Sequence, residues 1–167
     1  LYCILVTSKY HLRVNEDRKF HELNQVNFSK SIPATKIDNK LKGLKWITPP
    51  FKDNVEEEIN FIKDLKSQIQ TDKRKKMVIT HYSFISSILD ETFFSPSMAY
   101  TSDGSIIPLK NNKYSQKYKN LVINLIKKNN VDVIYIVYPV HKGSIAEYLD
   151  KSCLKEKLIF KGVISLS

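Results

Sequence analysis

The sequence contains little cysteine and no long apolar run, and each of these absences excludes a class of protein. Its two cysteines, Cys3 and Cys153, match no zinc-ligand spacing, so no metal site is expected. A disulfide between them is possible, but a buried thiol that packs as a small hydrophobe is the favoured state for each. No stretch reaches the roughly 18 consecutive apolar residues of a membrane-spanning helix. A chain of 167 residues can bury a core without metal or crosslinks, so we expect one domain, or one with a small appendage.

Arginine is also scarce. The formal charge is +10, yet only Arg13, Arg18 and Arg74 among the 27 basic residues are arginines, and the lysine bias is typical of an AT-rich genome. Phosphate and base recognition usually recruit the two-pronged guanidinium group, so this composition speaks against nucleic acid as the partner. No predicted helix carries a clean basic stripe. The charge instead favours a diffuse attraction to an anionic membrane surface or to a phosphorylated ligand.

From residue 43 onward, strand and helix patterns alternate. Pro49 and Pro50 end the first predicted strand, and an Asp53-Asn54 cap followed by three glutamates opens the first predicted helix. A nearly continuous run of β-branched and aromatic residues at 131–138 predicts the most buried strand. The predicted strands are 43–48, 77–80, 131–138, 157–160 and 163–166, and the predicted helices are 53–69, 83–90, 113–128 and 144–151, with a long loop at 91–112. This order predicts a Rossmann-like three-layer α/β domain over residues 43–167 with a mainly parallel central sheet.

Residues 1–42 fall outside this alternation. We interpret them as a lead-in segment with a helix near residues 13–23. The first six residues are apolar but lack the basic start and cleavage site of a signal peptide. They represent either the last turns of a transmembrane helix or an ordinary first helix or strand.

Ligands of open parallel sheets bind beyond the carboxyl ends of the strands. That rule groups Thr80, His81 and Tyr82 with residues 141–144, which are His141, Lys142, Gly143 and Ser144. The second group lies between a strand and a predicted helix start, where a lysine, a hydroxyl and free backbone N–H groups suit a phosphate or a carboxylate. The favoured alternative is structural: Ser144 and Glu147 form a capping box, Gly143 permits the turn and Lys142 is solvated.

His81 and His141 are the candidate catalytic residues, because a histidine can act as a general base near neutral pH. Thr80, Tyr82, Lys142, Gly143 and Ser144 are the candidate ligand-binding residues. A hydrogen-bonded structural role is the alternative for His81. The segment 101–105 resembles a hydrolase nucleophile only superficially and is interpreted as a turn, and Trp46 could stack on a sugar ring only if it is exposed. No cofactor is expected.

Several short segments resemble a known family. Residues 18–23 (Arg-Lys-Phe-His-Glu-Leu), 37–38 (Ile-Asp), 41–48 (Leu-Lys-Gly-Leu-Lys-Trp-Ile-Thr), 80–82 (Thr-His-Tyr) and 112–114 (Asn-Lys-Tyr) are similar to the soluble C-terminal region of bacterial polytopic membrane glycosyltransferases of the GT-C type. The resemblance spans most of the chain, but its motifs are not catalytic signatures. It implies a lipid-linked sugar donor and a catalytic acidic residue in the membrane portion, so it places no catalytic residue on this chain.

The resemblance therefore implies an extracytoplasmic, periplasmic accessory domain that is itself non-catalytic. Its partners would be the membrane portion of the same polypeptide and a lipid-linked sugar phosphate or anionic lipid headgroups. One alternative is an independent small α/β enzyme or anion-binding domain that uses the strand edge and resides in the cytoplasm. The second alternative is a nucleic-acid-binding module.

Overall fold

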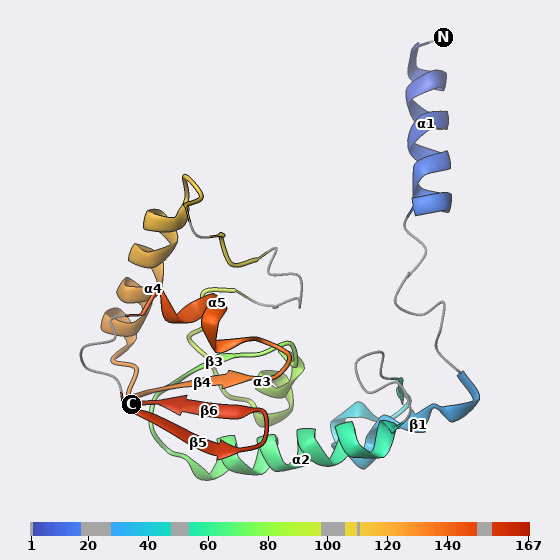
Figure 1. Ribbon diagram of the computed structural model, residues 1–167. Helices are drawn as coiled ribbons and strands as arrows, with labels where there is room; N and C mark the ends of the chain where they lie inside the picture. The colour runs from blue at the N-terminus through green and yellow to red at the C-terminus, as the bar shows by residue number, and fades with distance from the viewer. Residues whose placement is uncertain (1, 18–27, 48–53, 98–105, 110, 150–154) are drawn as a thin grey trace. The chain divides into compact units, whose positions relative to one another are not determined.

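The computed structural model describes residues 2–17, 28–47, 54–97, 106–109, 111–149 and 155–167. The chain divides into two compact units, residues 1–64 and 65–167 (Figure 1). The division falls within helix α2.

The first unit begins with α1 (Tyr2–Asp17). Three short 3-10 helices follow, η2 (Phe28–Lys30), η3 (Ala34–Lys36) and η4 (Asn39–Leu41), together with strands β1 (Ile32–Pro33) and β2 (Lys45–Trp46). The helix expected at residues 13–23 is confirmed up to Asp17, but it begins eleven residues earlier, at Tyr2; residues 18–23 lie outside the described part. Among the helices that the structure describes, none is long and apolar enough to cross a membrane.

Of the strand predicted at 43–48, the described residues 43–47 contain only β2, which does not join the four-stranded sheet. β2 pairs antiparallel with β1, Trp46 opposite Ile32, and forms a separate two-stranded sheet. The turn before β2 uses Gly43 at φ 90°, a conformation that other residues adopt only with strain. A pattern of alternation alone could not reveal this pairing, because β1 is two residues long and contains a proline.

Helix α2 (Val55–Thr71) confirms the predicted helix. Asn54 caps it, since its side-chain oxygen accepts a hydrogen bond from the Glu57 amide at 3.1 Å. Within the first unit, Glu58 is 2% exposed and accepts a hydrogen bond from Trp46 Nε1 at 2.8 Å. Trp46 is thus half-buried and hydrogen-bonded within this unit rather than displayed for stacking on a ligand.

The second unit is built on a four-stranded sheet in the order β3-β4-β6-β5. Its strands are β3 (Lys76–Ile79), β4 (Val133–Val137), β5 (Glu156–Phe160) and β6 (Val163–Leu166). The α/β class is confirmed, but the expectation of a mainly parallel sheet is wrong: β3 and β4 are parallel, whereas β4/β6 and β6/β5 are antiparallel.

The physical reason is the turn at Gly162, whose φ of 89° reverses the chain and makes β5 and β6 an antiparallel hairpin. The more apolar strand β6 takes the inner place beside β4. The strand with Glu156 and Lys157 exposed takes the edge, where charges discourage pairing with another chain.

Helices α4 (Ser115–Asn129) and α5 (Lys142–Ala146) contribute to a core with the sheet. The cluster combines alternate side chains of β3 and β4 with residues of both helices; its members include Met77, Ile79, Ile134, Ile136, Val122 and Ile145. Asn130 ends α4 in the left-handed conformation, as the predicted stop signal requires.

The other side chains of β3 and β4 are buried as well, among them Val78 and Tyr135. Gln68, near the end of α2, donates a hydrogen bond to the Tyr135 hydroxyl at 3.4 Å. Leu65 and Ile69 of α2 are fully buried, as is Ile85 of α3 (Phe84–Leu89). Both faces of the central strands are therefore covered, which explains the continuous apolar run of β4.

A polar contact links Tyr135 of β4 to Asp72, which directly follows α2. Tyr135 Oη donates a hydrogen bond to Asp72 Oδ2 at 2.5 Å. Arg74 donates two hydrogen bonds to the same carboxylate, from Nε to Oδ1 at 3.0 Å and from Nη2 to Oδ2 at 2.7 Å. The Arg74 hydrogen bonds hold the pKa of Asp72 far below its usual range, despite the opposing effect of burial. Burial raises the pKa of Tyr135, and its hydrogen bond to Asp72 raises it further.

Candidate functional site

The carboxyl ends of β3 and β4 lie at one edge of the sheet, as predicted. The two strands are parallel, and Ile79 is opposite Ile136, so the segments that follow them begin side by side. Thr80, His81 and Tyr82 follow β3, and residues 141–144 follow β4 after a short turn.

Thr80 and Tyr82 are buried, at 3% and 2% exposure, whereas His81 is exposed. Thr80 Oγ1 accepts a hydrogen bond from the Tyr82 amide at 2.9 Å and so shapes the turn after β3. The rings of His81 and Tyr82 meet edge to face with centroids 5.9 Å apart. Tyr82 packs in the same manner on Phe84, which opens α3.

Residues 141–144 differ from the prediction in their local structure. The helix begins at Lys142, so Ser144 lies inside α5 and donates its amide hydrogen to the His141 carbonyl; the expected capping box does not form. His141 occupies the N-cap position without a side-chain cap. Gly143 lies within the helix, and a Cβ placed there would meet nothing within 4 Å, so the turn does not require glycine.

Lys142 is not simply solvated. Its ammonium group forms an ion pair with Glu156 of β5, and both side chains are about half exposed. An anionic ligand at this position would have to compete with a carboxylate of the same chain, which weakens the phosphate-binding hypothesis for residues 141–144.

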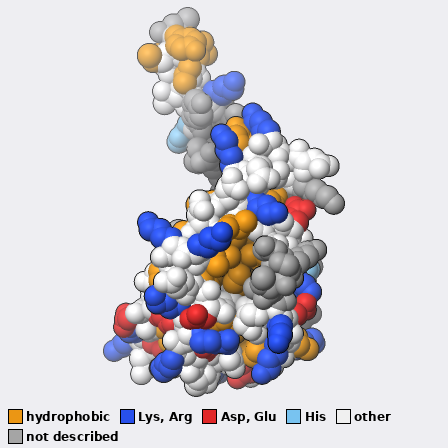
Figure 2. Space-filling view, turned by 90° about the vertical axis from the view of Figure 1, so that its left-hand side faces the viewer, with side chains coloured by type: hydrophobic (Ala, Val, Ile, Leu, Met, Phe, Trp, Pro, Cys, Tyr) orange, Lys and Arg blue, Asp and Glu red, His pale blue; other side chains and the backbone are white. Residues whose placement is uncertain are grey.

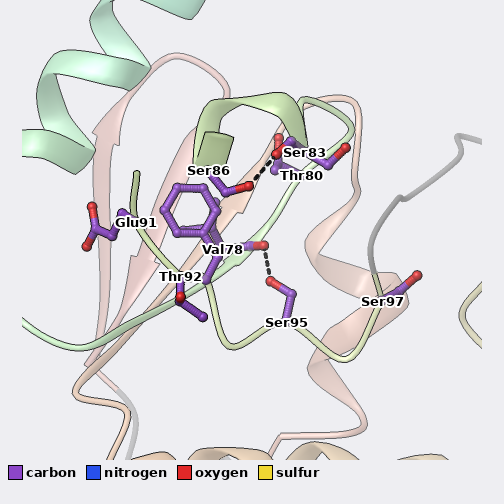
Figure 3. A pocket seen from close by; sticks show the side chains of 9 residues that line it. Val78, Thr80, Ser83, Ser86, Glu91, Thr92, Ser95 and Ser97 are labelled. Atoms are coloured by element: carbon purple, nitrogen blue, oxygen red, sulfur yellow. Dashed lines mark hydrogen bonds between the residues drawn. The ribbon is translucent and has the colours of Figure 1, made fainter. Parts of the chain in front are cut away.

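A pocket of about 220 Å³ opens beside β3 (Figure 3). Six hydroxyl side chains contribute to its lining: Thr80, Ser83, Ser86, Thr92, Ser95 and Ser97. Val78, Glu91 and Phe93 complete it. Of the seven residues singled out from the sequence, Thr80 alone belongs to this lining.

The pocket exists because the chain turns back along the open edge of β3. Asp90 ends α3 in the left-handed conformation at φ 52°, and the Glu91 amide donates to Ser86 O at 3.0 Å. The Phe94 amide then donates to Lys76 O at 3.3 Å, and the Ser95 hydroxyl donates to Val78 O. The segment after α3 therefore covers a sheet edge that would otherwise be unpaired.

A buried ion pair adjoins the pocket. Lys76 is 2% exposed and its ammonium group binds the carboxylate of Glu91, which is one-third exposed. The pair compensates the charge of Glu91, so the pocket wall is polar without a net charge from these two groups.

A second hollow of about 200 Å³ lies between α4 and the end of α5, and Tyr148, Glu147 and Lys119 contribute to it. Burial raises the pKa of Tyr148, and Glu147 raises it further. The Tyr148 hydroxyl already donates to the Pro108 carbonyl, and its ring packs edge to face on Tyr118. The hydrogen of this hydroxyl group is therefore used in a bond within the chain, which fixes Tyr148 against the segment at Pro108.

The basic side chains form no single stripe on the face shown in Figure 2, where lysines and arginines are scattered among acidic and neutral groups. In the ranges that the structure describes, no group of three or more His, Cys, Asp or Glu could hold a metal ion. The segment 101–105 and Cys153 lie outside these ranges.

Sequence reasoning missed the serines and threonines of the pocket because Ser83 and Ser86 lie in a predicted helix and residues 91–112 carry only loop signals. The one available signal was the density of hydroxyl residues directly after the Thr80 strand end, at 83, 86, 92, 95 and 97. Comparisons with protein-family models, with curated proteins and with solved structures found no match to this chain.

Proposed function

We propose that the chain is an extracytoplasmic accessory domain of a bacterial membrane glycosyltransferase that uses a lipid-linked sugar donor, and that the chain itself is non-catalytic. The proposal combines the family resemblance with one structural observation, the exposed apolar end of α1. The strand-end residues would then serve structure and binding, and the membrane portion of the same polypeptide would supply the catalytic group.

The observation concerns Tyr2, Ile4 and Leu5, which are 80%, 68% and 61% exposed. Hydrophobic side chains gather at this end of α1 in Figure 2. Successive residues of a helix are about 100° apart, so Tyr2, Ile4 and Leu5, together with the exposed Cys3 between them, surround the helix axis. No single protein face could cover such a helix end, whereas a bilayer surrounds a helix on every side. A bilayer also explains an overall charge of +10, because its anionic headgroups attract lysines.

We further propose that residues 65–167 form a Rossmann-like three-layer domain whose sheet has gained an antiparallel hairpin. The core of α4 and α5 with the sheet, and the Gln68–Tyr135 hydrogen bond from the opposite helix, support this arrangement.

The membrane contact is tested by flotation of the 167-residue chain with vesicles of phosphatidylglycerol and phosphatidylethanolamine. Each large apolar side chain transferred from water contributes about 1.5–3 kcal/mol, so changing Ile4 and Leu5 together to Ser should lower vesicle binding at least tenfold. Leu158→Ser is the matched control, since Leu158 is equally exposed, at 66%, but lies on β5. Equal losses in both proteins would contradict the proposed role of α1.

The enzymatic role is tested on the complete polypeptide that contains this chain, expressed in membranes and supplied with a lipid-linked sugar donor. We expect sugar transfer to an acceptor, and we expect His81→Ala and His141→Ala to leave the rate within about threefold, because both side chains lie outside the catalytic centre. A polypeptide without further hydrophobic helices would overturn the proposal. A loss of activity of about a hundredfold or more in either histidine variant would instead favour the alternative of a small enzyme at the strand edge.

A further inference from the structure

We propose that the pocket beside β3 binds one neutral, hydroxyl-rich ring, a single sugar unit. The choice of a sugar rests on the proposed function, whereas the requirement for a neutral ligand rich in hydroxyl donors follows from the pocket alone.

Two hydroxyl groups of the pocket, those of Ser86 and Ser95, are oriented by main-chain carbonyls. Ser86 Oγ donates its hydrogen to the Ser83 carbonyl at 2.9 Å, and Ser95 Oγ donates to the Val78 carbonyl. Figure 3 shows both bonds, one from α3 and one from the segment that covers β3. A hydroxyl that has used its hydrogen keeps two lone pairs, so both oxygens can act as acceptors toward a ligand.

Thr80 behaves in the opposite way. Its oxygen accepts the Tyr82 amide hydrogen, so its own hydrogen is available to donate. The carboxylate of Glu91 adds further acceptor capacity. Of these four groups, Ser86, Ser95 and Glu91 offer acceptor atoms and Thr80 offers a donor. A ligand that satisfies them must bring several hydroxyl hydrogens, as a sugar ring does.

The pairing of Glu91 with Lys76 in the wall disfavours charged ligands of either sign. Phosphate and carboxylate ligands bring acceptors and negative charge, and they would meet acceptor oxygens and the Glu91 carboxylate. A cationic ligand would have to displace Lys76, which is buried against Glu91 and cannot reach water without opening the sheet edge. A neutral ligand avoids both costs.

The volume sets the size of the ligand. A pocket of about 220 Å³ is roughly seven times the volume of about 30 Å³ that one water molecule takes in the liquid, which suits one pyranose ring rather than a disaccharide. Phe93 is half-buried in the lining and supplies apolar surface for the C–H groups of such a ring. Hydroxyl acceptors beside an aromatic surface match the amphipathic character of a sugar.

The proposal is tested by amide NMR titration of the 167-residue chain with the methyl glycosides of glucose, mannose, galactose and N-acetylglucosamine, and separately with inorganic phosphate. We expect saturable millimolar binding of at least one glycoside, with shifts at Thr80, Ser86, Thr92 and Ser95, and no such shifts with phosphate. Loss of one hydrogen bond to a neutral ligand should weaken binding about three- to tenfold in Ser86→Ala and in Thr92→Val.

The matched control is Ser87→Ala, because Ser87 is the exposed neighbour of Ser86 on α3 and does not line the pocket. Unchanged spectra with all four glycosides would overturn the proposal, as would phosphate binding at these amides or equal weakening by Ser87→Ala. The outcome is separable from the enzymatic test: glycoside binding without sugar transfer would refute the glycosyltransferase role alone, and transfer without glycoside binding would refute the pocket alone.

Discussion

Tyr135→Phe tests whether the contact between β4 and the end of α2 is a charge-assisted hydrogen bond that stabilises the fold. Tyr135 is fully buried, and its hydroxyl lies 2.5 Å from Asp72 Oδ2. Hydrogen bonds to a charged group contribute about 1.5–3 kcal/mol, so removing this hydroxyl should lower the free energy of unfolding by about 2 kcal/mol. Asp72 keeps its bonds to Arg74, and Gln68 can turn toward water, so the loss should not exceed this range.

For a chain of this size, 1 kcal/mol corresponds to about 2–4 °C in melting temperature, so we expect a decrease of about 4–8 °C. The assay is urea unfolding followed by circular dichroism, together with a thermal melt. Tyr114→Phe is the matched control, because Tyr114 is 52% exposed and a phenyl ring keeps its contact with the Lys113 ammonium group. That variant should remain within about 0.5 kcal/mol of the parent protein.

The effect should also depend on pH in a defined direction. The folded-state pKa of Asp72 is lowered, chiefly by Arg74, so the stabilisation from its charge is fully present above the unfolded value near 4. It is lost progressively as the pH falls below about 4 toward the lowered pKa of the folded state. The cost of Tyr135→Phe should therefore stay close to its pH 7 value down to about pH 3 and fall only as the pH approaches the lowered folded-state pKa of Asp72, where a neutral hydrogen bond replaces the charge-assisted one. A cost that is already below 0.5 kcal/mol at pH 7, or one that has already halved at about pH 4, would refute this reasoning.

Two further predictions concern the backbone. Asn54→Ala removes the α2 cap on the Glu57 amide and should cost about 1 kcal/mol in urea unfolding, whereas Asn60→Ala, on the exposed surface of the same helix, should cost nothing. Gly162→Ala places a side chain at φ 89° and should lower the melting temperature through a loss of about 1–2 kcal/mol, whereas Gly143→Ala, inside α5 with open space around it, should raise stability by about 0.5–1 kcal/mol. Equal effects within either pair would contradict the structural assignment.

Elements with a complete local signal could be predicted from the sequence. Asn54 and the three glutamates after it define the start of α2, Asn130 defines the end of α4, and the β-branched run defines β4. Each of these signals lies within a few residues of the element it specifies. They account for the α/β class and for the position of the strand ends that follow β3 and β4.

Long-range pairing could not be predicted in the same way. β2 pairs with a two-residue strand that includes Pro33, and β6 rather than β5 pairs with β4, because burial of β6 and the charges of β5 decide the order. The pocket was missed for a related reason. The segment after Asp90 has no helix or strand period, and its position along β3 depends on main-chain bonds to Lys76 and Val78.

The ion pair between Lys76 and Glu91 gives a last prediction, in which the two partners are not equivalent. Lys76 is buried with 2% exposure, whereas one-third of the Glu91 side chain is exposed. Glu91→Gln leaves an ammonium group buried without its counter-charge and should cost about 3 kcal/mol or more. Lys76→Met removes the buried charge and keeps the apolar volume, and it leaves a carboxylate that water can reach, so it should cost about 1 kcal/mol.

The measurement is urea unfolding of both variants at pH 7, with Lys73→Met as the control for loss of an exposed lysine just before β3. If the pair acts as an attraction between two equivalent charges, both variants should lose the same stability. If burial of the ammonium group dominates, Glu91→Gln should be the less stable by about 2 kcal/mol, and the double variant should recover most of the loss. A Lys76→Met protein that is as unstable as Glu91→Gln would contradict the dominant role of the buried ammonium group, because the Glu91 carboxylate would then need its counter-charge as much as Lys76 does, although one-third of its side chain is exposed.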